Sequence, residues 1–248
     1  MKQRILTIML ALVAIALNAS AESYNIWLAG TQLSNANLSG DPTTGTVDVT
    51  GISGVTGSVK LRVNLPVNSW DQVIYQLYLD NATIINTSNS SSAHQEGIYC
   101  SERLQISLTG TNTVRSTYGT GIDFHNNWQS TIYNSNGTLT VKGTSGIFVG
   151  DSQDDFFIDD EPDSRYSVLT INCAEVTIEG TNGYGICGSI LQEKYLNSLQ
   201  LSNLSVKGTE GAICNFNELS FGSGYGSGQS IQQPSGARVV NHAVCDAS

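Results

Sequence analysis

Basic residues are scarce in this chain, and their scarcity narrows the range of partners. Eleven lysines and arginines stand against 21 aspartates and glutamates, which gives a formal net charge of −10. A surface of this sign repels the phosphates of nucleic acid and the head groups of anionic lipid. The composition therefore argues against nucleic acid and against an anionic membrane surface as partners.

Proline and charged residues of either sign are also few. The chain has four prolines and only 13% charged residues, whereas serine, threonine, asparagine and glycine are abundant. This composition is typical of many short strands joined by tight turns, and it does not fit a largely disordered chain. We therefore expect an all-β protein.

A continuous apolar run occurs only at the start of the chain. Lys2 and Arg4 precede apolar residues 5–17, and small residues follow at 19–21, which is the pattern of a secretory signal peptide. The run is short for a membrane span, and no cysteine follows it directly to accept a lipid. We expect residues 1–21 to be a signal peptide and the mature protein to be exported to the periplasm, the cell surface or the medium, without membrane insertion.

Five cysteines follow this leader, and their odd number leaves at least one of them unpaired within the chain. Five are too few for a disulfide-built miniprotein of this length, and none has the paired Cys-x-x-Cys spacing of a zinc site. The sequence gives little support for a structural metal cluster.

Three segments of the chain are nearly identical. They read Val-Lys-Gly-Thr-Ser-Gly at 141–146, Ile-Glu-Gly-Thr-Asn-Gly at 178–183 and Val-Lys-Gly-Thr-Glu-Gly at 206–211, and short alternating apolar runs precede each. Such self-similarity is the mark of a stacked repeat, in which each unit buries its apolar face against its neighbours. Stacking like segments about 4.8 Å apart places leucine over leucine and valine over valine.

Gly-Ile pairs measure the length of the repeat. The pairs that begin at 97, 121 and 146 are 24 and 25 residues apart, about the length of three short strands with their turns. The next interval, to Gly185, is longer because an acidic insert occupies 150–166. We therefore predict a single-stranded parallel β-helix, right-handed and of about five coils, with an antiparallel β-sandwich as the alternative.

The repeat also divides the mature chain. Residues 24–60 lack it, and we expect 22–72 to be an N-terminal β cap region in which the strand at 24–28 pairs over the open end of the first coil. The repeat covers 73–221, and a glycine-rich C-terminal segment follows at 222–248.

Several stretches resemble a known family. Tyr-Asn-Ile-Trp-Leu-Ala-Gly-Thr-Gln-Leu at 24–33 with Asn-Ala-Asn at 35–37, Leu-Asp-Asn-Ala-Thr-Ile at 79–84, and the Leu-Thr-Gly-Thr-Asn-Thr-Val run ending at Val114 resemble secreted bacterial β-helix repeat proteins, most of which have no assigned function. The resemblance covers most of the mature chain. Some related β-helices look like non-catalytic, calcium-dependent binders of acidic polysaccharide, so the resemblance implies glycan binding without identifying any binding residue.

Catalysis on a β-helix needs acids, bases or metal ligands that converge on one outward face. Only one of the five residues that follow the inward isoleucines is a carboxylate, Asp123. The five are Tyr99, Asp123, Phe148, Cys187 and Cys214. A hydrolase with two catalytic carboxylates lacks its pair there.

Asp123 and His125, with Trp128, are either a fragment of a hydrolytic or binding site or solvated residues at a coil edge. We expect His94 and His242 to be surface histidines in polar loops.

Aromatic residues near position 128 form the candidate glycan site. The ring of Trp128 can cover the C–H face of a sugar while Asn127 and Gln129 hydrogen-bond its hydroxyl groups. We expect Tyr118 and Tyr133 to flank it on neighbouring turns. The alternative is that Trp128 packs against its own coil.

The acidic insert is a candidate calcium site. Seven carboxylates surround the apolar triplet 156–158, and calcium takes six to eight oxygen ligands. The spacing is not that of an EF-hand, and the alternative is a solvated surface loop. The candidate ligands are Asp151, Asp154, Asp155, Asp159 and Asp160.

Cys187 and Cys214 occupy equivalent positions in successive repeats, so we expect them to lie about 4.8 Å apart. That separation falls within the Cα–Cα range of disulfides. The pair is either a disulfide or an unbonded cysteine stack.

From these observations we expect an exported, non-catalytic binding or adhesion module that recognises polysaccharide or a cell-surface glycan. The alternatives are a β-helix polysaccharide lyase or glycoside hydrolase, and a structural or assembly protein without a small ligand.

Overall fold

The structure is a computed structural model. It describes residues 22–67, 72–90, 93–125, 129–150, 167–189, 198–201, 204–216, 218–221, 230–231, 238–240 and 243–245. The expected leader at 1–21, most of the acidic insert and much of the segment 222–248 lie outside the described residues.

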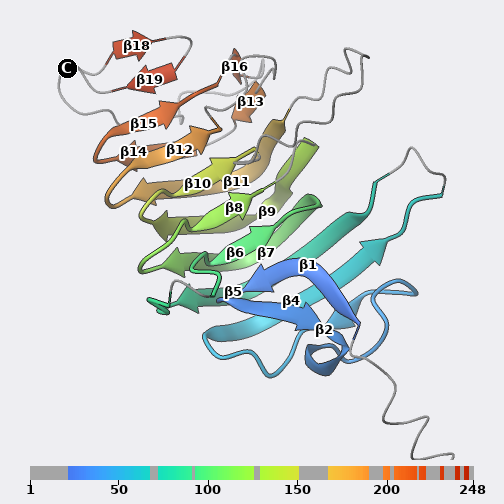
Figure 1. Cartoon of the computed structure of the whole chain (residues 1–248). Helices are drawn as coiled ribbons and strands as arrows, with labels where there is room; N and C mark the ends of the chain where they lie inside the picture. The colour runs from blue at the N-terminus through green and yellow to red at the C-terminus, as the bar shows by residue number, and fades with distance from the viewer. Residues whose placement is uncertain are drawn as a thin grey trace, which may run out of the picture.

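The described chain is all β apart from one 3-10 turn at Asn35–Asn37, and its strands form two sheets (Figure 1). The nine-stranded sheet contains, in spatial order, β18 (Arg238–Val240), β19 (Ala243–Cys245), β15 (Gly211–Cys214), β12 (Tyr184–Gly188), β10 (Ile147–Val149), β8 (Ile122–Phe124), β6 (Ile98–Cys100), β1 (Ser23–Leu28) and β2 (Thr31–Ser34). The ten-stranded sheet contains, in spatial order, β16 (Glu218–Phe221), β13 (Ser198–Leu201), β11 (Val168–Gly180), β9 (Gln129–Gly143), β7 (Arg103–Ser116), β5 (Ile74–Asn86), β4 (Val55–Asn64) and β3 (Val47–Asp48). Two further strands of this sheet, β14 (Leu204–Gly208) and β17 (Ser230–Ile231), lie outside that order, and β14 pairs with both β11 and β17. From β5 to β12 the chain alternates between the two sheets.

Like segments of the repeat lie side by side in parallel. The isoleucine of each Gly-Ile pair is the register partner of the next, and all of them are buried: Ile98, Ile122, Ile147, Ile186 and, in the last repeat, Ile213. In the ten-stranded sheet Val141 lies beside Ile178, and Ile178 beside Val206. The predicted parallel stacking of these segments is confirmed, and they do not pair as antiparallel hairpins.

The first two apolar segments of the early repeats form one long strand each instead of two. In β5 the joint is at Asn81, which has a left-handed φ of 48° where the register against β7 shifts. The Asn81 side chain accepts a hydrogen bond from the Thr111 amide at 3.1 Å, and the buried side chain of Asn112 accepts one from the Ala82 amide at 2.9 Å. The two asparagine side chains thus accept hydrogen bonds from backbone N–H groups that the irregular register leaves unpaired, so strand pairing continues through the joint.

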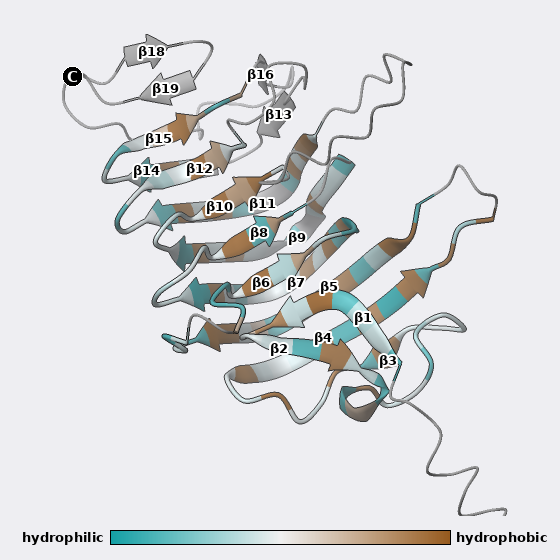
Figure 2. Ribbon diagram, viewed as in Figure 1, coloured by the Kyte–Doolittle hydropathy of each residue, from teal (hydrophilic) through white to brown (hydrophobic). Residues whose placement is uncertain are grey.

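Alternation along the strands places one row of side chains in a common core. Apolar and polar residues alternate in both sheets (Figure 2), and side chains from both sheets, such as Leu77 and Ile122, belong to one buried cluster. Each fully buried aliphatic side chain contributes about 1.5–3 kcal/mol of stability. The opposite row faces away from the core and supplies the candidate site.

The N-terminal strands pair antiparallel with the first repeat. β1 pairs with β2 and with β6, and β4 pairs with β5. The strand at 24–28 therefore lies against the start of the parallel part of the nine-stranded sheet and brings Trp27 beside Tyr99. None of the helical structure within the described ranges is long and apolar enough to span a membrane.

Candidate binding site

One column of side chains, the outer column, crosses six strands on the side of the nine-stranded sheet that faces away from the core. Neighbouring members are register partners, in the order Trp27, Tyr99, Asp123, Phe148, Cys187 and Cys214. The five members after Trp27 are the residues that the Gly-Ile repeat predicts for this position. Trp27 joins them through the antiparallel pairing of β1 with β6, which the repeat does not contain.

Two histidines extend the outer column into a continuous row of rings, here called the ring row. The centroid of His94 lies 4.5 Å from that of Trp27 and 4.1 Å from that of Tyr99. His125 lies 5.2 Å from Tyr99 and 6.4 Å from Phe148. All five rings are partly exposed. His94 is a partly exposed residue in a loop, as expected, but it is not isolated, because its ring packs against Trp27 and Tyr99.

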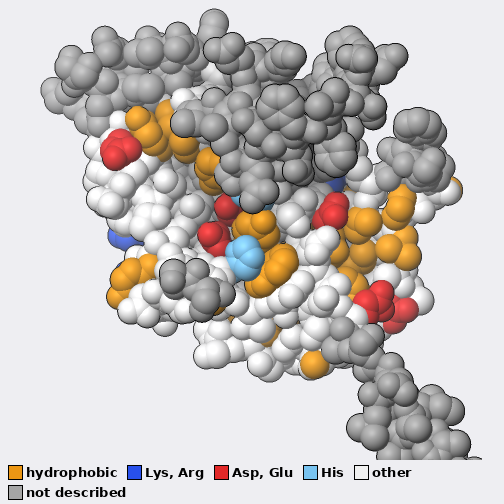
Figure 3. Space-filling model, viewed as in Figure 1, with side chains coloured by type: hydrophobic (Ala, Val, Ile, Leu, Met, Phe, Trp, Pro, Cys, Tyr) orange, Lys and Arg blue, Asp and Glu red, His pale blue; other side chains and the backbone are white. Residues whose placement is uncertain are grey.

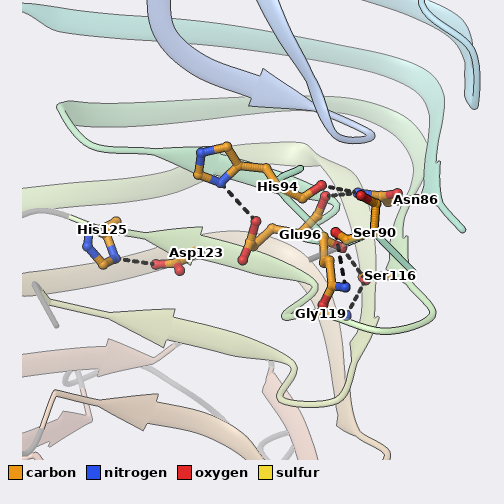
Figure 4. A network of polar contacts seen from close by, with 9 residues as sticks. Asn86, Ser90, His94, Glu96, Ser116, Gly119, Asp123 and His125 are labelled. Atoms are coloured by element: carbon orange, nitrogen blue, oxygen red, sulfur yellow. Dashed lines mark hydrogen bonds and ion pairs between the residues drawn. The ribbon is translucent and has the colours of Figure 1, made fainter. Parts of the chain in front are cut away.

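Each histidine of the ring row faces a carboxylate (Figure 4). His94 Nδ1 is 3.1 Å from Glu96 Oε2, and His125 Nδ1 is 3.6 Å from Asp123 Oδ1, a distance typical of an ion pair and too long for a hydrogen bond. Strand positions alone place one carboxylate on this face. The structure corrects that count to two, because Glu96 reaches the face from the loop before β6.

Asp123 is the most perturbed acid of the site. The residue is 8% exposed, and its buried Oδ1 has no hydrogen-bond partner among the described residues. Burial raises the pKa of this carboxyl, His125 opposes the rise, and the negative charge of Glu96 adds to it. A buried acid in this state is more often found at a functional site than in an ordinary core.

Buried polar side chains from two strands hold the loop that carries His94 and Glu96. Asn86 Nδ2 donates hydrogen bonds to the carbonyl oxygens of His94 at 3.0 Å and Glu96 at 2.8 Å. Ser116, the register partner of Asn86, donates from Oγ to the carbonyl of Gln95 at 2.5 Å. Three consecutive carbonyl groups are therefore fixed (Figure 4), which sets the position of both side chains before any ligand arrives.

The strands that carry the ring row and their neighbours up to β15 contain no basic residue, whereas Asp123 lies in one of them. β1, β2, β6, β8, β10, β12 and β15 contain no lysine or arginine. The lysines and arginines whose side chains the structure describes lie in the other sheet: Lys60, Arg62, Arg103, Arg115, Lys142 and Lys207. Figure 3 shows acidic, histidine and hydrophobic side chains gathered on the face that carries the ring row.

The aromatic residues expected to form the glycan site are only partly described. Trp128 and Asn127 lie outside the described residues, whereas Gln129 is exposed at the start of β9. Tyr133 is half-buried in β9 beside Ser107, and Tyr118 is 50% exposed in the turn after β7 ends. The structure places these two tyrosines near opposite ends of the long strands, so it does not bring them together at one point.

The candidate calcium ligands all lie outside the described residues: Asp151, Asp154, Asp155, Asp159 and Asp160. Within the part of the chain that the structure describes, no group of three or more histidine, cysteine, aspartate or glutamate side chains is arranged to hold a metal ion. A calcium site in the acidic insert stays a prediction.

Cys187 and Cys214 stack as the repeat predicts. They are register partners, and their Sγ atoms lie 2.7 Å apart as thiols. The hydrogen bond from Cys214 lowers the pKa of the Cys187 thiol, while burial raises it and Asn215 Nδ2, 3.5 Å from the Cys187 sulfur, lowers it. A disulfide between them stays a prediction.

No protein-family model, curated protein or solved structure matches this chain.

Proposed function

We propose that the protein is an exported binding or adhesion module that recognises polysaccharide along the ring row. Five partly exposed rings in contact, with two carboxylates beside them, carry the proposal. Aromatic rings with a few fixed polar groups are the usual chemistry of a site that binds an amphipathic ligand such as a sugar. The resemblance to secreted β-helix proteins and the expected leader support export.

The proposed architecture explains why a polymer suits this site. In a single-stranded, right-handed parallel β-helix of about five coils with an N-terminal cap, equivalent side chains repeat about every 4.8 Å along the axis. The outer column then offers a chain-like ligand several contacts in sequence. Since each ring is already held by its neighbours, little side-chain entropy is lost on binding.

The ring geometry also determines which part of each ring meets the ligand. The planes of His94 and Tyr99 are 37° apart, and those of Tyr99 and His125 are 33° apart, so adjacent faces partly cover each other. Trp27 and Phe148 end the row, so we propose that their outer faces are the main platforms for a sugar. The polar groups of His94, Tyr99 and His125 lie between these two platforms and would hydrogen-bond its hydroxyl groups.

A glycan array with and without calcium tests the proposal, followed by Tyr99→Ala on any hit. Tyr78→Ala is the matched control, because Tyr78 is also a partly exposed outward tyrosine but lies in β5 of the other sheet. We expect Tyr99→Ala to weaken binding at least about tenfold, or 1.4 kcal/mol, with little effect of the control. Equal effects of the two variants, or no binding to any glycan, would contradict the proposal and favour a structural protein.

The two carboxylates also favour a second candidate, a glycoside hydrolase or lyase. Asp123 is buried and has a raised pKa, whereas Glu96 is paired with His94, and two acids in different environments are the basis of acid–base catalysis on sugars. Assays for new reducing or unsaturated ends on acidic and neutral polysaccharides test it. Turnover by the wild type that Glu96→Gln removes would establish an enzyme, whereas binding without turnover leaves the module non-catalytic.

A further inference from the structure

The fold satisfies the carboxylate of Asp123 only in part. Its buried Oδ1 has no hydrogen-bond partner within the described chain, and His125 Nδ1 is 3.6 Å away. Its neighbours in the outer column are the aromatic rings of Tyr99 and Phe148. A buried carboxylate oxygen without a hydrogen bond reduces stability, and the Asp123 side chain as a whole is still 12% exposed, so a ligand group can approach this carboxylate.

The charged groups around Asp123 define what that group must be. Those close enough to influence it are Glu96, His94 and His125, and the strands around them contain no lysine or arginine. Loss of the expected leader would leave nine basic residues against 21 acidic ones, a formal charge of −12, which attracts cations to the surface. A ligand group that approaches these two carboxylates is therefore favoured if it carries a positive charge.

An ammonium group fits this position better than a metal ion. Calcium needs six to eight oxygen ligands and zinc needs about four, whereas no group of three or more metal-binding side chains is found in the described ranges. An ammonium group needs only a carboxylate to accept its N–H hydrogens and aromatic rings to face its charge. Asp123, Glu96 and the ring row provide these groups.

We infer that the site binds the protonated amino group of an amino sugar, with Asp123 as its ion-pair partner and Tyr99 and Phe148 beside it. The inference rests on the proposed function and names its ligand class, a polysaccharide whose amines are not acetylated. An acidic polysaccharide would bring its own carboxylates against Asp123 and Glu96, and an acetylated one would place a neutral amide where the charge is needed.

Three oligosaccharides of equal length test the inference by titration calorimetry. They are β-1,4-linked glucosamine, its fully N-acetylated form and oligogalacturonate. Each is titrated in a series of buffers from acidic to neutral pH, because the amine must be protonated while Asp123, whose pKa is raised, must be ionised. We expect the glucosamine oligomer to bind at least about tenfold more tightly than the other two. Asp123→Asn should reduce that preference to less than about threefold, Glu96→Gln should reduce it in part, and Tyr78→Ala should leave it unchanged.

The outcomes separate the inference from the function on which it rests. Equal or tighter binding of the acetylated or acidic oligomer overturns the amine inference while glycan binding stands. Failure of all three to bind also overturns it, and the glycan array then decides whether the proposed function fails as well. Circular dichroism of each variant shows whether it is folded, and Glu96→Gln provides a second test if Asp123→Asn is not.

Discussion

The side-chain amide of Asn86 donates a 3.0 Å hydrogen bond to the backbone carbonyl of His94 and so fixes the loop that completes the ring row. The same Nδ2 donates to the carbonyl of Glu96, and Asn86 is only 2% exposed. A buried residue at the end of β5, in the ten-stranded sheet, therefore controls two side chains on the outside of the nine-stranded sheet.

Asn86→Ala should lower both stability and affinity. The change leaves two carbonyl groups without their donor, which costs about 1–3 kcal/mol of unfolding free energy. It also frees the loop, so affinity for any glycan that binds the ring row should fall. Urea denaturation and calorimetry measure the two effects. Asn172→Ala is the control because Asn172 is exposed in β11, and it should change stability by less than about 0.5 kcal/mol.

Asp123→Asn should raise stability while it weakens amine binding. The folded-state pKa of Asp123 is raised, so the folded protein holds the proton more tightly than the unfolded chain does. The stability that this proton provides is complete below the unfolded pKa and is lost as the pH rises through the folded pKa. The variant has no charge to bury, so its advantage over the wild type should be small near pH 4 and larger near pH 8.

Thermal melts of both proteins across this pH range measure the difference. Asp48→Asn is the control, since the Asp48 side chain is 57% exposed, and its melting temperature should follow that of the wild type. If the variant at position 123 is less stable than the wild type near pH 8, the fold itself stabilises the ionised carboxylate, and the amine inference is overturned.

The amino-acid sequence predicts the features that depend on the repeat alone. Spacing of the Gly-Ile pairs places Tyr99, Asp123 and Phe148 in one column and stacks Cys187 on Cys214, because like segments pair in parallel. No such rule connects the N-terminal strand or the loop before β6 to that column.

Because no such rule exists for these two segments, the sequence alone does not predict the ring row. Trp27 reaches it through antiparallel pairing between segments about 70 residues apart, and no repeat signal marks that pairing. His94 and Glu96 reach it only because Asn86 and the next strand's Ser116 hold their loop. A hydrophilic loop looks the same in sequence whether its carbonyl groups are fixed by buried side chains or solvated by water.

Calcium should stabilise the protein if the acidic insert binds it. A ligand that binds only the folded state at 100 times its Kd adds about 2.7 kcal/mol of stability. Melting temperatures with excess calcium, with magnesium and with a chelator measure this, and Asp154→Asn combined with Asp155→Asn should remove the calcium effect. No rise with calcium would leave the insert as a solvated loop.

Cys187 should react faster with alkylating reagents than Cys100 in the reduced protein. The hydrogen bond from Cys214 lowers the pKa of the Cys187 thiol, whereas burial raises that of Cys100, so Cys187 has a larger thiolate fraction than Cys100 at any given pH. Iodoacetamide labelling followed by peptide mapping measures the rates. Preferential labelling of Cys100 would contradict the assignment.

Oxidation should join Cys187 to Cys214. Oxidised glutathione accepts the two electrons and two protons that the thiols release, and the intact mass should fall by two hydrogens. Cys187→Ser should prevent this change. A mass that stays unchanged after oxidation would show that the pair remains an unbonded stack despite the 2.7 Å between its sulfur atoms.

Gly121→Ala should destabilise the fold strongly, because the repeated glycine lets neighbouring strands approach closely. A Cβ atom at Gly121 would lie 2.5 Å from Cγ1 of Val141 and 2.6 Å from the carbonyl oxygen of Gly146, so either the side chain or the backbone must move. Overpacking of this kind costs about 1–3 kcal/mol. Gly45→Ala is the control, since no atom lies within 4 Å of its added Cβ. Urea denaturation of the two variants should show a loss of stability at 121 and little change at 45, and equal losses would mean that close packing is not why the Gly-Ile pair recurs.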